Sequence, residues 1–429
     1  MIAAPTSGAG KTTVTLGLLA ALRQRGVAVA GAKLGPDYID PTYHAAATGR
    51  ASLNLDGWAM SDAALLARFS EMDADLVIVE GAMGALDGSG PAALGSSADM
   101  AERLELPIVL VIDCAKQAQS AALAAAGLCQ LRPRVALAGV ILNRIASDRH
   151  LQLIRPAFEA LGIPILGAVR RQPGLTRPER HLGLVPMPEL EDAQAFLSRA
   201  AETIGAVVDL DALQAVATPA KAAPIAPAHT LAPLGRHIAI ARDAAFAFAY
   251  PHHLKDWEAR NAQLSFFSPL AGEGPDQRAD AIFLPGGYPE LHGAKLASAG
   301  RFRDAMCGAA DRGVCIYGEC GGYMTLGEAM IDSEGQSHRM LGLLPLTTSF
   351  AERKLSLGHR DLAALGPHPF GATLKAHEFH YATVVSERID DDTQRLFEAH
   401  DSFGRSLGAI GLRRGSVMGS FAHVICAAD

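Results

Sequence analysis

The chain opens with MIAAPTSGAGKTTVT (residues 1–15), in which a run of small residues ends on Gly-Lys-Thr-Thr, the ending of a phosphate-binding loop. Pro5 stands where such a loop normally has its first glycine, and proline is tolerated there if the backbone φ is about −65°. Small residues let backbone N–H groups approach phosphate oxygens, and the following helix adds the positive end of its dipole. The stretch predicts a nucleotide site, with a plain glycine-rich turn as the alternative. The residues expected to contact the nucleotide are Gly8, Gly10, Lys11, Thr12 and Thr13.

A nucleotide site of this kind also needs Mg²⁺ and oxygen ligands that hold it. We expect Lys11 to reach the β and γ phosphates and Thr12 to hold the metal ion. Glu80 follows an apolar run in DLVIVEGA (75–82) and is a further expected Mg²⁺ ligand, with a structural strand-end carboxylate as the alternative. The segment KLGPDYIDPTYH (33–44) has more functional groups than a plain loop needs. It supplies Asp40 as a metal candidate, and Lys33 and Asp37 as candidates for substrate binding.

Beyond the loop, short apolar runs alternate with helical patterns through the first half of the chain. The runs are rich in Val and Ile and are bounded by Gly or Pro, as buried parallel strands are. The Ala-rich stretch 13–26 ends on Gly26, which is typical of a helix C-terminus. The alternation predicts βαβ units, and hence a parallel sheet with helices on both faces. Strands are expected at residues 27–33, 75–82, 106–113, 134–143 and 163–169, after a very short first strand that precedes the loop.

The composition changes at residues 214–235, where several prolines stand among alanines without any hydrophobic period. Such a segment is typical of a linker between domains. After it, the pattern of strands and helices resumes. We therefore expect two α/β domains, at residues 1–213 and 236–429, each with a mainly parallel sheet flanked by helices. The strands of the second domain are expected at residues 237–243, 263–268, 279–287 and 313–320.

The overall composition excludes several classes of protein. The 429 residues are 49% hydrophobic and 19% charged, with a net charge of −7. A nucleic-acid-binding protein normally has a basic excess, which is missing from this sequence. No apolar run has the length of a membrane span, and the N-terminus lacks the layout of a signal peptide, so we expect a cytoplasmic protein without a membrane partner. The six cysteines form no C-x-x-C pair and are expected to be reduced thiols.

A second stretch that carries chemistry is GVCIYGECGGYMTLGEAM (313–330), which places Cys320 at the tip of an apolar strand. Gly321 and Gly322 follow, and then a helix, as in a nucleophile elbow that exposes a side chain above a sheet. A helix dipole and a nearby histidine would lower the pKa of the thiol below its usual value of about 8.5. The alternative is a cysteine that only fills the core.

Two further patterns in the second half support the nucleophile. Gly286 and Gly287 end a neighbouring strand in FLPGGYPE, and their backbone N–H groups could form an oxyanion hole. His423, in SFAHVI near the C-terminus, is the expected base. His377 and His380, in HEFHY, are rivals for that role, and the order of cysteine followed by a histidine on the last strand favours His423.

These motifs together resemble those of the a,c-diamide synthases of cobalamin biosynthesis, which act on cobyrinic or hydrogenobyrinic acid. The resemblance covers nearly the whole chain and depends on the order of the motifs. It implies a dethiobiotin-synthetase-like, P-loop ATP domain followed by a class I glutamine amidotransferase domain. The motifs that carry it are SGAGKTT, KLGPDYIDP, NLDGW, EGAMGALDG, PERHLGLVP, LPGGYPE, YGECGGYM and HEFHY.

The resemblance implies an ATP-dependent carbon–nitrogen ligase. ATP and Mg²⁺ are the implied cofactors, and a corrinoid polycarboxylate and glutamine are the implied partners. ATP would phosphorylate a substrate carboxylate, Cys320 would release ammonia from glutamine through a thioester, and the ammonia would attack the acyl phosphate at positions a and c in turn. Class I glutaminases often have Glu two residues after the histidine. Here that residue is Ile425, which implies a Cys–His pair, and Glu319 is expected to face away from it.

Other readings of the sequence stay open at this point. The KLGPDYIDP motif argues against cobyric acid synthase, but nickel sirohydrochlorin a,c-diamide synthases share nearly the same motifs. A P-loop regulatory ATPase with a non-catalytic glutaminase-like domain is the alternative from another class, and the presence of both Cys320 and His423 argues against it. The metal content of the ring stays undetermined, and a homodimer is one assembly that the sequence allows. Candidates for binding substrate carboxylates are Arg180 first, and then Arg170, Arg171, Arg177 and Lys375.

Overall fold

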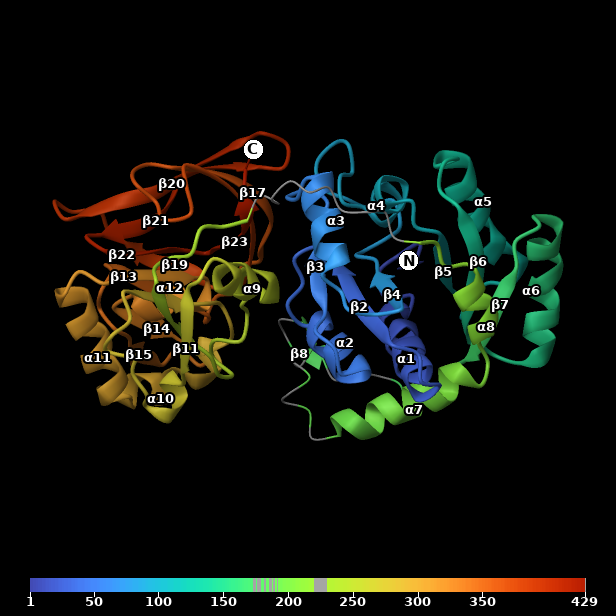
Figure 1. Cartoon of the computed structure of the whole chain (residues 1–429), viewed down its shortest axis with the longest axis horizontal. Helices are drawn as coiled ribbons and strands as arrows, with labels where there is room; N and C mark the ends of the chain where they lie inside the picture. The colour runs from blue at the N-terminus through green and yellow to red at the C-terminus, as the bar shows by residue number, and fades with distance from the viewer. Residues whose placement is uncertain are drawn as a thin grey trace. The chain divides into compact units, whose positions relative to one another are not determined.

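In the computed structural model, which describes residues 1–172, 175, 179–180, 183–184, 187, 190, 192–219 and 230–428, the chain forms two compact units (Figure 1). The first unit comprises Met1–Ala228 and the second comprises His229–Asp429. All six cysteines are free thiols, as expected. Among the described residues, no helix is both long and apolar enough to cross a membrane. Each unit is an α/β domain with hydrophobic clusters of its own.

The first unit is built on a seven-stranded parallel sheet with the order β3-β2-β4-β1-β5-β6-β7. All the strands predicted for this unit form. β1 has only two residues but lies at the centre of the sheet, between β4 and β5, so the phosphate-binding loop leaves from the middle of the carboxyl edge. β3 is not predicted from the sequence, because three residues are too few to show a hydrophobic periodicity. The strands are β1 (Ile2–Ala3), β2 (Val29–Leu34), β3 (Leu53–Leu55), β4 (Leu76–Glu80), β5 (Ile108–Asp113), β6 (Leu137–Ile145) and β7 (Ile165–Arg170).

Helices cover both faces of this sheet. Side chains alternate along β5, where Val109 and Val111 belong to one hydrophobic cluster and Leu110 to another. α1 (Lys11–Gln24) packs in the first cluster beside α7 (Ala193–Gly205), the green helix in Figure 1. The other helices are α2 (Asp40–Thr48), α3 (Asp62–Ser70), α4 (Ser97–Leu104), η1 (Gln119–Ala121), α5 (Ala122–Leu131), α6 (Asp148–Ala160) and α8 (Leu210–Ala215), and β8 (Glu179–Arg180) pairs with β9 (Gly183–Leu184).

The segment predicted as a linker, 214–235, has structured ends. α8 continues to Ala215, so the first residues of the segment are helical. Leu231 and Leu234 are buried in a hydrophobic cluster of the second unit. Both ends therefore belong to the units, and residues 220–229 lie outside the described part of the chain.

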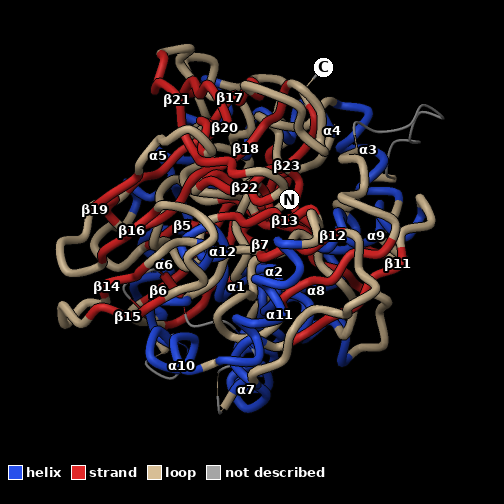
Figure 2. Tube along the Cα trace, turned by 90° about the vertical axis from the view of Figure 1, so that its left-hand side faces the viewer, coloured by secondary structure: helices blue, strands red, loops and turns tan. Residues whose placement is uncertain are grey.

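The second unit contains a ten-stranded sheet that is mixed rather than mainly parallel. Five strands, in the order β11-β10-β12-β13-β22, are parallel, and the sheet continues with antiparallel strands in the order β21-β20-β17-β18-β23. Figure 2 shows β17, β18, β20 and β21 grouped together. The strands are β10 (His237–Ala241), β11 (Gln263–Phe267), β12 (Ala281–Leu284), β13 (Cys315–Glu319), β17 (Ser356–Ala364), β18 (Thr373–His380), β20 (Thr393–Asp401), β21 (Ser406–Arg414), β22 (Val417–Ser420) and β23 (Ala422–Ala427).

Smaller elements complete the second unit. A four-stranded sheet has the order β15-β14-β16-β19. Its strands are β14 (Ala329–Ile331), β15 (Ser337–Arg339), β16 (Leu346–Ser349) and β19 (Thr383–Glu387). The helices are α9 (Pro251–Ala259), η4 (Pro269–Ala271), η5 (Pro289–His292), α10 (Gly293–Ser298), α11 (Gly300–Asp311) and α12 (Gly321–Leu326). The nucleophile turn lies between β13 and α12, at the carboxyl end of a parallel strand, where ligands bind in open α/β sheets.

Candidate active sites

The phosphate-binding loop of the first unit requires glycine at two positions. Gly8 and Gly10 have φ values of 77° and 92°, a left-handed region that strains any residue with a Cβ. A Cβ on Gly10 would also overlap the side chain of Asn143. The Asn143 amide donates a hydrogen bond to the carbonyl of Ala9, at 2.8 Å. Asn143 thus braces the loop from β6, a role that its isolated position in the sequence does not reveal.

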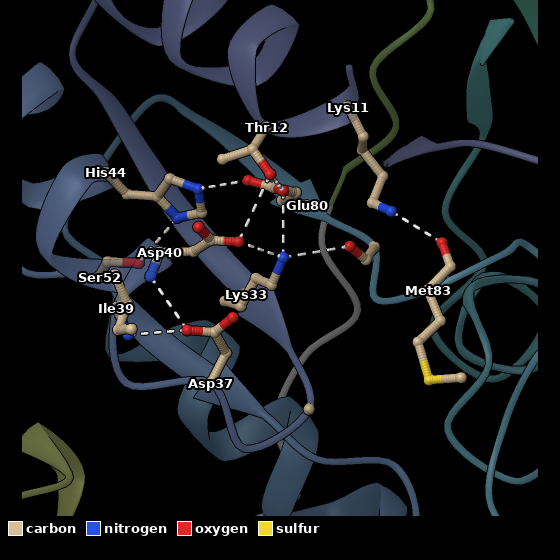
Figure 3. A network of polar contacts seen from close by, with 12 residues as sticks. Lys11, Thr12, Lys33, Asp37, Ile39, Asp40, His44, Ser52, Glu80 and Met83 are labelled. Atoms are coloured by element: carbon tan, nitrogen blue, oxygen red, sulfur yellow. Dashed lines mark hydrogen bonds and ion pairs between the residues drawn. The ribbon is translucent and has the colours of Figure 1, made fainter. Parts of the chain in front are cut away.

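Lys11 and Thr12 begin α1 directly after the loop, and Thr13 follows in the same turn. The Lys11 ammonium donates to the carbonyl of Met83, at 2.8 Å, in the turn after β4 (Figure 3). Burial, and then the nearby charge of Lys33, lower the pKa of Lys11 to about 8. A bound phosphate would raise the pKa of Lys11 again, because a nearby anion favours the charged ammonium.

The predicted metal ligands converge beneath the loop. The Thr12 hydroxyl contacts the Glu80 carboxylate and lies 3.5 Å from Oδ2 of Asp40 (Figure 3). Lys33 stands between the two acids, with its Nζ 2.6 Å from Asp40 Oδ2 and 3.0 Å from Glu80 Oε1. All four side chains come from the carboxyl edge of the sheet or the helices that follow it. The structure therefore brings together residues that lie far apart in the sequence.

The charged groups of this cluster shift each other's pKa values. Burial alone would raise the pKa of Glu80, but Lys33, and after it His44 and Thr12, outweigh burial and hold the pKa well below its usual range. For Lys33, burial lowers the pKa, and Asp40 and Glu80 outweigh it, so that its pKa is raised. Nε2 of His44 lies 2.7 Å from Glu80 Oε2. Sequence reasoning missed His44, although its place four residues after Asp40, on the same side of α2, was a usable signal.

The residues proposed for substrate binding lie in different settings. Asp37 accepts the backbone N–H groups of Ile39 and Asp40, at 2.7 and 3.0 Å, so one of its oxygens shapes the turn before α2. Arg170 is exposed and pairs with Asp148 at 2.5 Å, and Lys375, in the second unit, pairs with Asp361 at 2.5 Å. Arg171 is exposed. Arg180 belongs to β8, and its side chain and the whole of Arg177 lie outside the described residues.

The donor set of the cluster suits Mg²⁺. One hydroxyl and two carboxylates are hard oxygen donors, and Mg²⁺ is usually bound by one or two carboxylates together with phosphate oxygens and water. Within the described residues, no group of three or more His, Cys, Asp or Glu side chains could hold a metal by itself. We expect a metal ion at Thr12, Asp40 and Glu80 to take its remaining ligands from phosphate oxygens and water.

The second site is built on a strained turn. Cys320 follows β13 with a φ of 47°, in the region that residues with a Cβ rarely adopt, as a nucleophile elbow requires. Gly322 must lack a side chain, because a Cβ there would overlap the carbonyl of Leu284 on β12. The N–H of Cys320 donates to the carbonyl of Ser420, at 2.8 Å, which ties the turn to the end of β22.

The glycine turn after β12 lies between the elbow and His423. A Cβ on Gly321 would be 3.1 Å from the backbone nitrogen of Gly287, and a Cβ on Gly286 would overlap Cε1 of His423. The structure therefore brings together the cysteine, the two glycines and the histidine that were predicted from separate motifs. This arrangement can perform acyl transfer through a covalent cysteine intermediate.

The rival histidines are engaged elsewhere. In His380, Nδ1 lies 3.0 Å from the carbonyl of Ala382 and Nε2 lies 2.8 Å from Oε1 of Glu378, so neither nitrogen is free to act as a base. His377 contacts the ring of His359 on the neighbouring strand, at 5.4 Å between centroids. These contacts favour His423 as the partner of Cys320.

The expected low pKa of the thiol is wrong for this structure. Cys320 is only 4% exposed, and burial, followed by the charge of Glu290, raises its pKa well above the usual value. Burial, and then the nearby His380, lower the pKa of His423 to about 3. These shifts favour a neutral thiol and a neutral imidazole in the resting state.

The expectation that Glu319 faces away from the histidine is also wrong. Oε2 of Glu319 lies 3.8 Å from Nδ1 of His423, and Oε1 accepts the N–H of Val424 at 3.0 Å. Glu319 ends β13, and its side chain reaches β23 at Val424. Consecutive strand residues point to opposite faces, so a residue next to Cys320 in the sequence is expected to point away from the site. For this reason the contact between Glu319 and His423 could not be predicted.

Comparisons with known proteins agree with this two-part arrangement. Residues 1–185 match the family described as the CobQ/CobB/MinD/ParA nucleotide binding domain, and residues 237–429 match the CobB/CobQ-like glutamine amidotransferase domain. Hydrogenobyrinate a,c-diamide synthase of Brucella anthropi is 55% identical to the chain over 429 residues, which cover 99% of this chain and 98% of the relative. The proteins of that name from Sinorhizobium sp. and Rhizobium meliloti are 50% and 49% identical, each over 99% of this chain and 98% of the relative. The chain therefore belongs to the hydrogenobyrinate a,c-diamide synthase family.

Proposed function

We propose that the protein uses ATP and glutamine to convert the a and c carboxylates of hydrogenobyrinic acid into amides, as a step of cobalamin biosynthesis. The observation that carries this proposal is the presence of two complete sets of reactive side chains on a chain that is 55% identical to such a synthase along its whole length. One set, around Lys11 and Glu80, is suited to phosphates, and the other, around Cys320 and His423, to acyl transfer.

In this proposal the first domain, residues 1–213, activates the substrate. Backbone N–H groups from Gly8 to Thr13, with the Lys11 ammonium, bind the phosphates of ATP. Thr12, Asp40 and Glu80 hold Mg²⁺, which neutralises charge on the phosphates when it is bound. Lys33 contacts both carboxylates, at 2.6 and 3.0 Å, and its charge favours the ionised form of Glu80. Asp37 and Arg180 remain candidates for contacts with the carboxylate-rich substrate.

The second domain, residues 236–429, supplies ammonia in this proposal. His423 accepts the thiol proton of Cys320 as the sulfur attacks the amide carbon of glutamine. Backbone N–H groups at Gly286 and Gly287 stabilise the oxyanion that forms. The thioester is then hydrolysed to glutamate, and the ammonia replaces phosphate on the activated carboxylate.

The proposal is tested by product analysis. Purified protein is incubated with MgATP and glutamine, and with hydrogenobyrinic acid, cobyrinic acid or nickel sirohydrochlorin as acceptor. Mass spectrometry should detect the a,c-diamide of hydrogenobyrinic acid. Amidation of nickel sirohydrochlorin alone would assign the protein to the other a,c-diamide synthases, and glutamine hydrolysis without any amide product would contradict the ligase assignment.

Substituting Glu80 with glutamine should raise the Mg²⁺ concentration needed for half-maximal activity and lower turnover by about 10²-fold or more. The amide keeps the size of the side chain but removes the negative charge that contacts Lys33 at 3.0 Å and the ring of His44 at 2.7 Å. The measurement is turnover against Mg²⁺ concentration. As a control, Glu102→Gln, on α4 and paired with Arg134 at 2.9 Å, should leave the curve unchanged. An unchanged metal requirement in Glu80→Gln would show that Glu80 is structural.

Substituting Gly286 with alanine should sharply reduce glutamine use and spare ammonia use, because the added methyl group would displace His423. Gly300→Ala is the matched control, since a Cβ at Gly300 meets no atom within 4 Å. Initial rates with the two nitrogen donors measure the effect. Wild-type glutamine kinetics in Gly286→Ala would contradict the placement of His423 against this turn.

A further inference from the structure

The surroundings of His423 raise the question of what orients its ring. A histidine that acts as a base toward a thiol needs its second nitrogen fixed, because that contact sets the tautomer. Two residues beyond His423, on the same side of β23, stands Ile425, which is buried and apolar. The strand that carries the histidine therefore supplies no acid at that position.

A carboxyl group reaches the ring from another strand. Glu319, the last residue of β13, has a side chain that is 4% exposed. Its Oε2 lies 3.8 Å from Nδ1 of His423, a distance that a small rotation of either side chain would close to a hydrogen bond. Its Oε1 accepts the N–H of Val424, at 3.0 Å, and this bond anchors the carboxyl group beside the histidine.

We propose that Glu319 is a positioning residue for His423: its carboxyl group accepts the Nδ1 proton, so that Nε2 is the nitrogen that takes the proton of the Cys320 thiol. This inference rests on the proposed glutaminase function of the second domain. It places the nucleophile and the orienting acid on consecutive residues, so that one strand end fixes both partners of the histidine.

The proton transfers balance around this arrangement. The thiol proton passes to Nε2 of His423 as the sulfur bonds to the amide carbon of glutamine. The imidazolium then gives that proton to the leaving nitrogen as the carbon–nitrogen bond breaks, which yields ammonia and a thioester. Water attacks the thioester with Nε2 as base, and the proton returns to the sulfur as glutamate leaves. Throughout, Nδ1 keeps its proton against Glu319.

The electrostatics of the two groups support this role. Burial raises the pKa of Glu319 to about 8, against the opposing hydrogen bond from the N–H of Val424. The ionised carboxylate has Oε2 as the acceptor for the Nδ1 proton, while Oε1 keeps the N–H of Val424. When His423 becomes a cation during the attack, its charge favours the ionised carboxylate, so the acid stabilises the step that creates the charge.

The test separates this role from a structural one. Glu319→Gln keeps an oxygen that can accept the Val424 N–H, so it preserves the anchoring bond, but its amide group can also donate to Nδ1 and so favour the wrong tautomer. We expect kcat for glutamine hydrolysis to fall at least about tenfold with little change in KM, and synthesis from ammonium salts to stay at the wild-type rate. Glu319→Asp, which keeps the acid on a shorter side chain, should recover part of kcat.

A matched control is Glu328→Gln, which removes an exposed carboxylate of the same unit that pairs with Arg388 at 2.5 Å, and should not affect either rate. If the wild-type protein hydrolyses glutamine and Glu319→Gln does so with the same kcat, the positioning role is rejected while the proposed function stands. Equal losses in Glu319→Gln with both nitrogen donors would also reject it, in favour of a structural role. If the wild-type protein does not hydrolyse glutamine, the proposed function and this inference both fail.

Discussion

Replacing Cys320 with alanine is expected to lower amidation with glutamine by about 10⁴-fold or more and to leave amidation with ammonium salts near the wild-type rate. The thiol is needed only to attack the glutamine amide, and its neighbours, the Gly286–Gly287 turn and His423, all belong to the second unit. The residues that we propose to bind phosphate belong to the first unit and should be unaffected. The measurement is the rate of product formation with each donor, with ammonium supplied at alkaline pH so that more free ammonia is present.

Two further variants sharpen this result. His423→Asn should behave like Cys320→Ala, because a buried thiol with a raised pKa stays protonated without a base. Cys307→Ala, which removes a partly buried thiol from α11, should keep both activities. If Cys320→Ala still used glutamine, the nucleophile would lie elsewhere. If it lost ammonia use as well while its circular dichroism stayed native, the two half-reactions would not be separable.

Replacing Lys11 with alanine should abolish amidation with both nitrogen donors, with a loss of about 10²–10³-fold or more. Its ammonium is held in the turn after β4, beside the Thr12–Glu80 contact, where the phosphates of the nucleotide are expected. In Lys11→Ala, the ammonium group no longer stabilises the negative charge that develops on the transferred phosphoryl group. No acyl phosphate should therefore form. Rates of ADP release and amide formation, each with glutamine and with ammonium, measure the effect.

The control for Lys11→Ala is Arg155→Ala, which removes an exposed cation from α6 of the same unit and should be silent. Normal turnover of Lys11→Ala with ammonium would show that the loop does not activate the substrate. A loss confined to glutamine would show that Lys11 acts on ammonia supply instead. Either result would contradict the proposal that the first site activates the substrate and the second site supplies ammonia.

The sequence predicted the elements that depend on local patterns. Buried parallel strands are short and continuously apolar, so all strands of the seven-stranded sheet except β3 could be recognised, and the loop with Lys11 and Thr12 has a spacing of its own. Glu80 could be placed because strand ends meet at one edge of a parallel sheet. Cys320 could be recognised as an elbow residue from the glycines that follow it.

The features that escaped prediction depend on tertiary contacts. The antiparallel strands β17, β20 and β21 mix buried residues with half-buried and exposed ones and contain few long apolar runs. The contacts of Glu319 with His423 and of Asn143 with Ala9 join residues that are 104 and 134 positions apart, which no local pattern reports. The raised pKa of Cys320 follows from burial, which outweighs the expected helix dipole at this turn.

The most direct test of activation through an acyl phosphate traces the oxygen atoms of the substrate carboxylates. Hydrogenobyrinic acid with ¹⁸O in its a and c carboxylates is incubated with the protein, MgATP and glutamine, and the inorganic phosphate is examined by mass spectrometry. If each carboxylate is phosphorylated and ammonia then displaces the phosphate, one ¹⁸O atom should pass into phosphate for every amide formed. Amide formation together with unlabelled phosphate would contradict activation through an acyl phosphate, and with it the role assigned to the first unit.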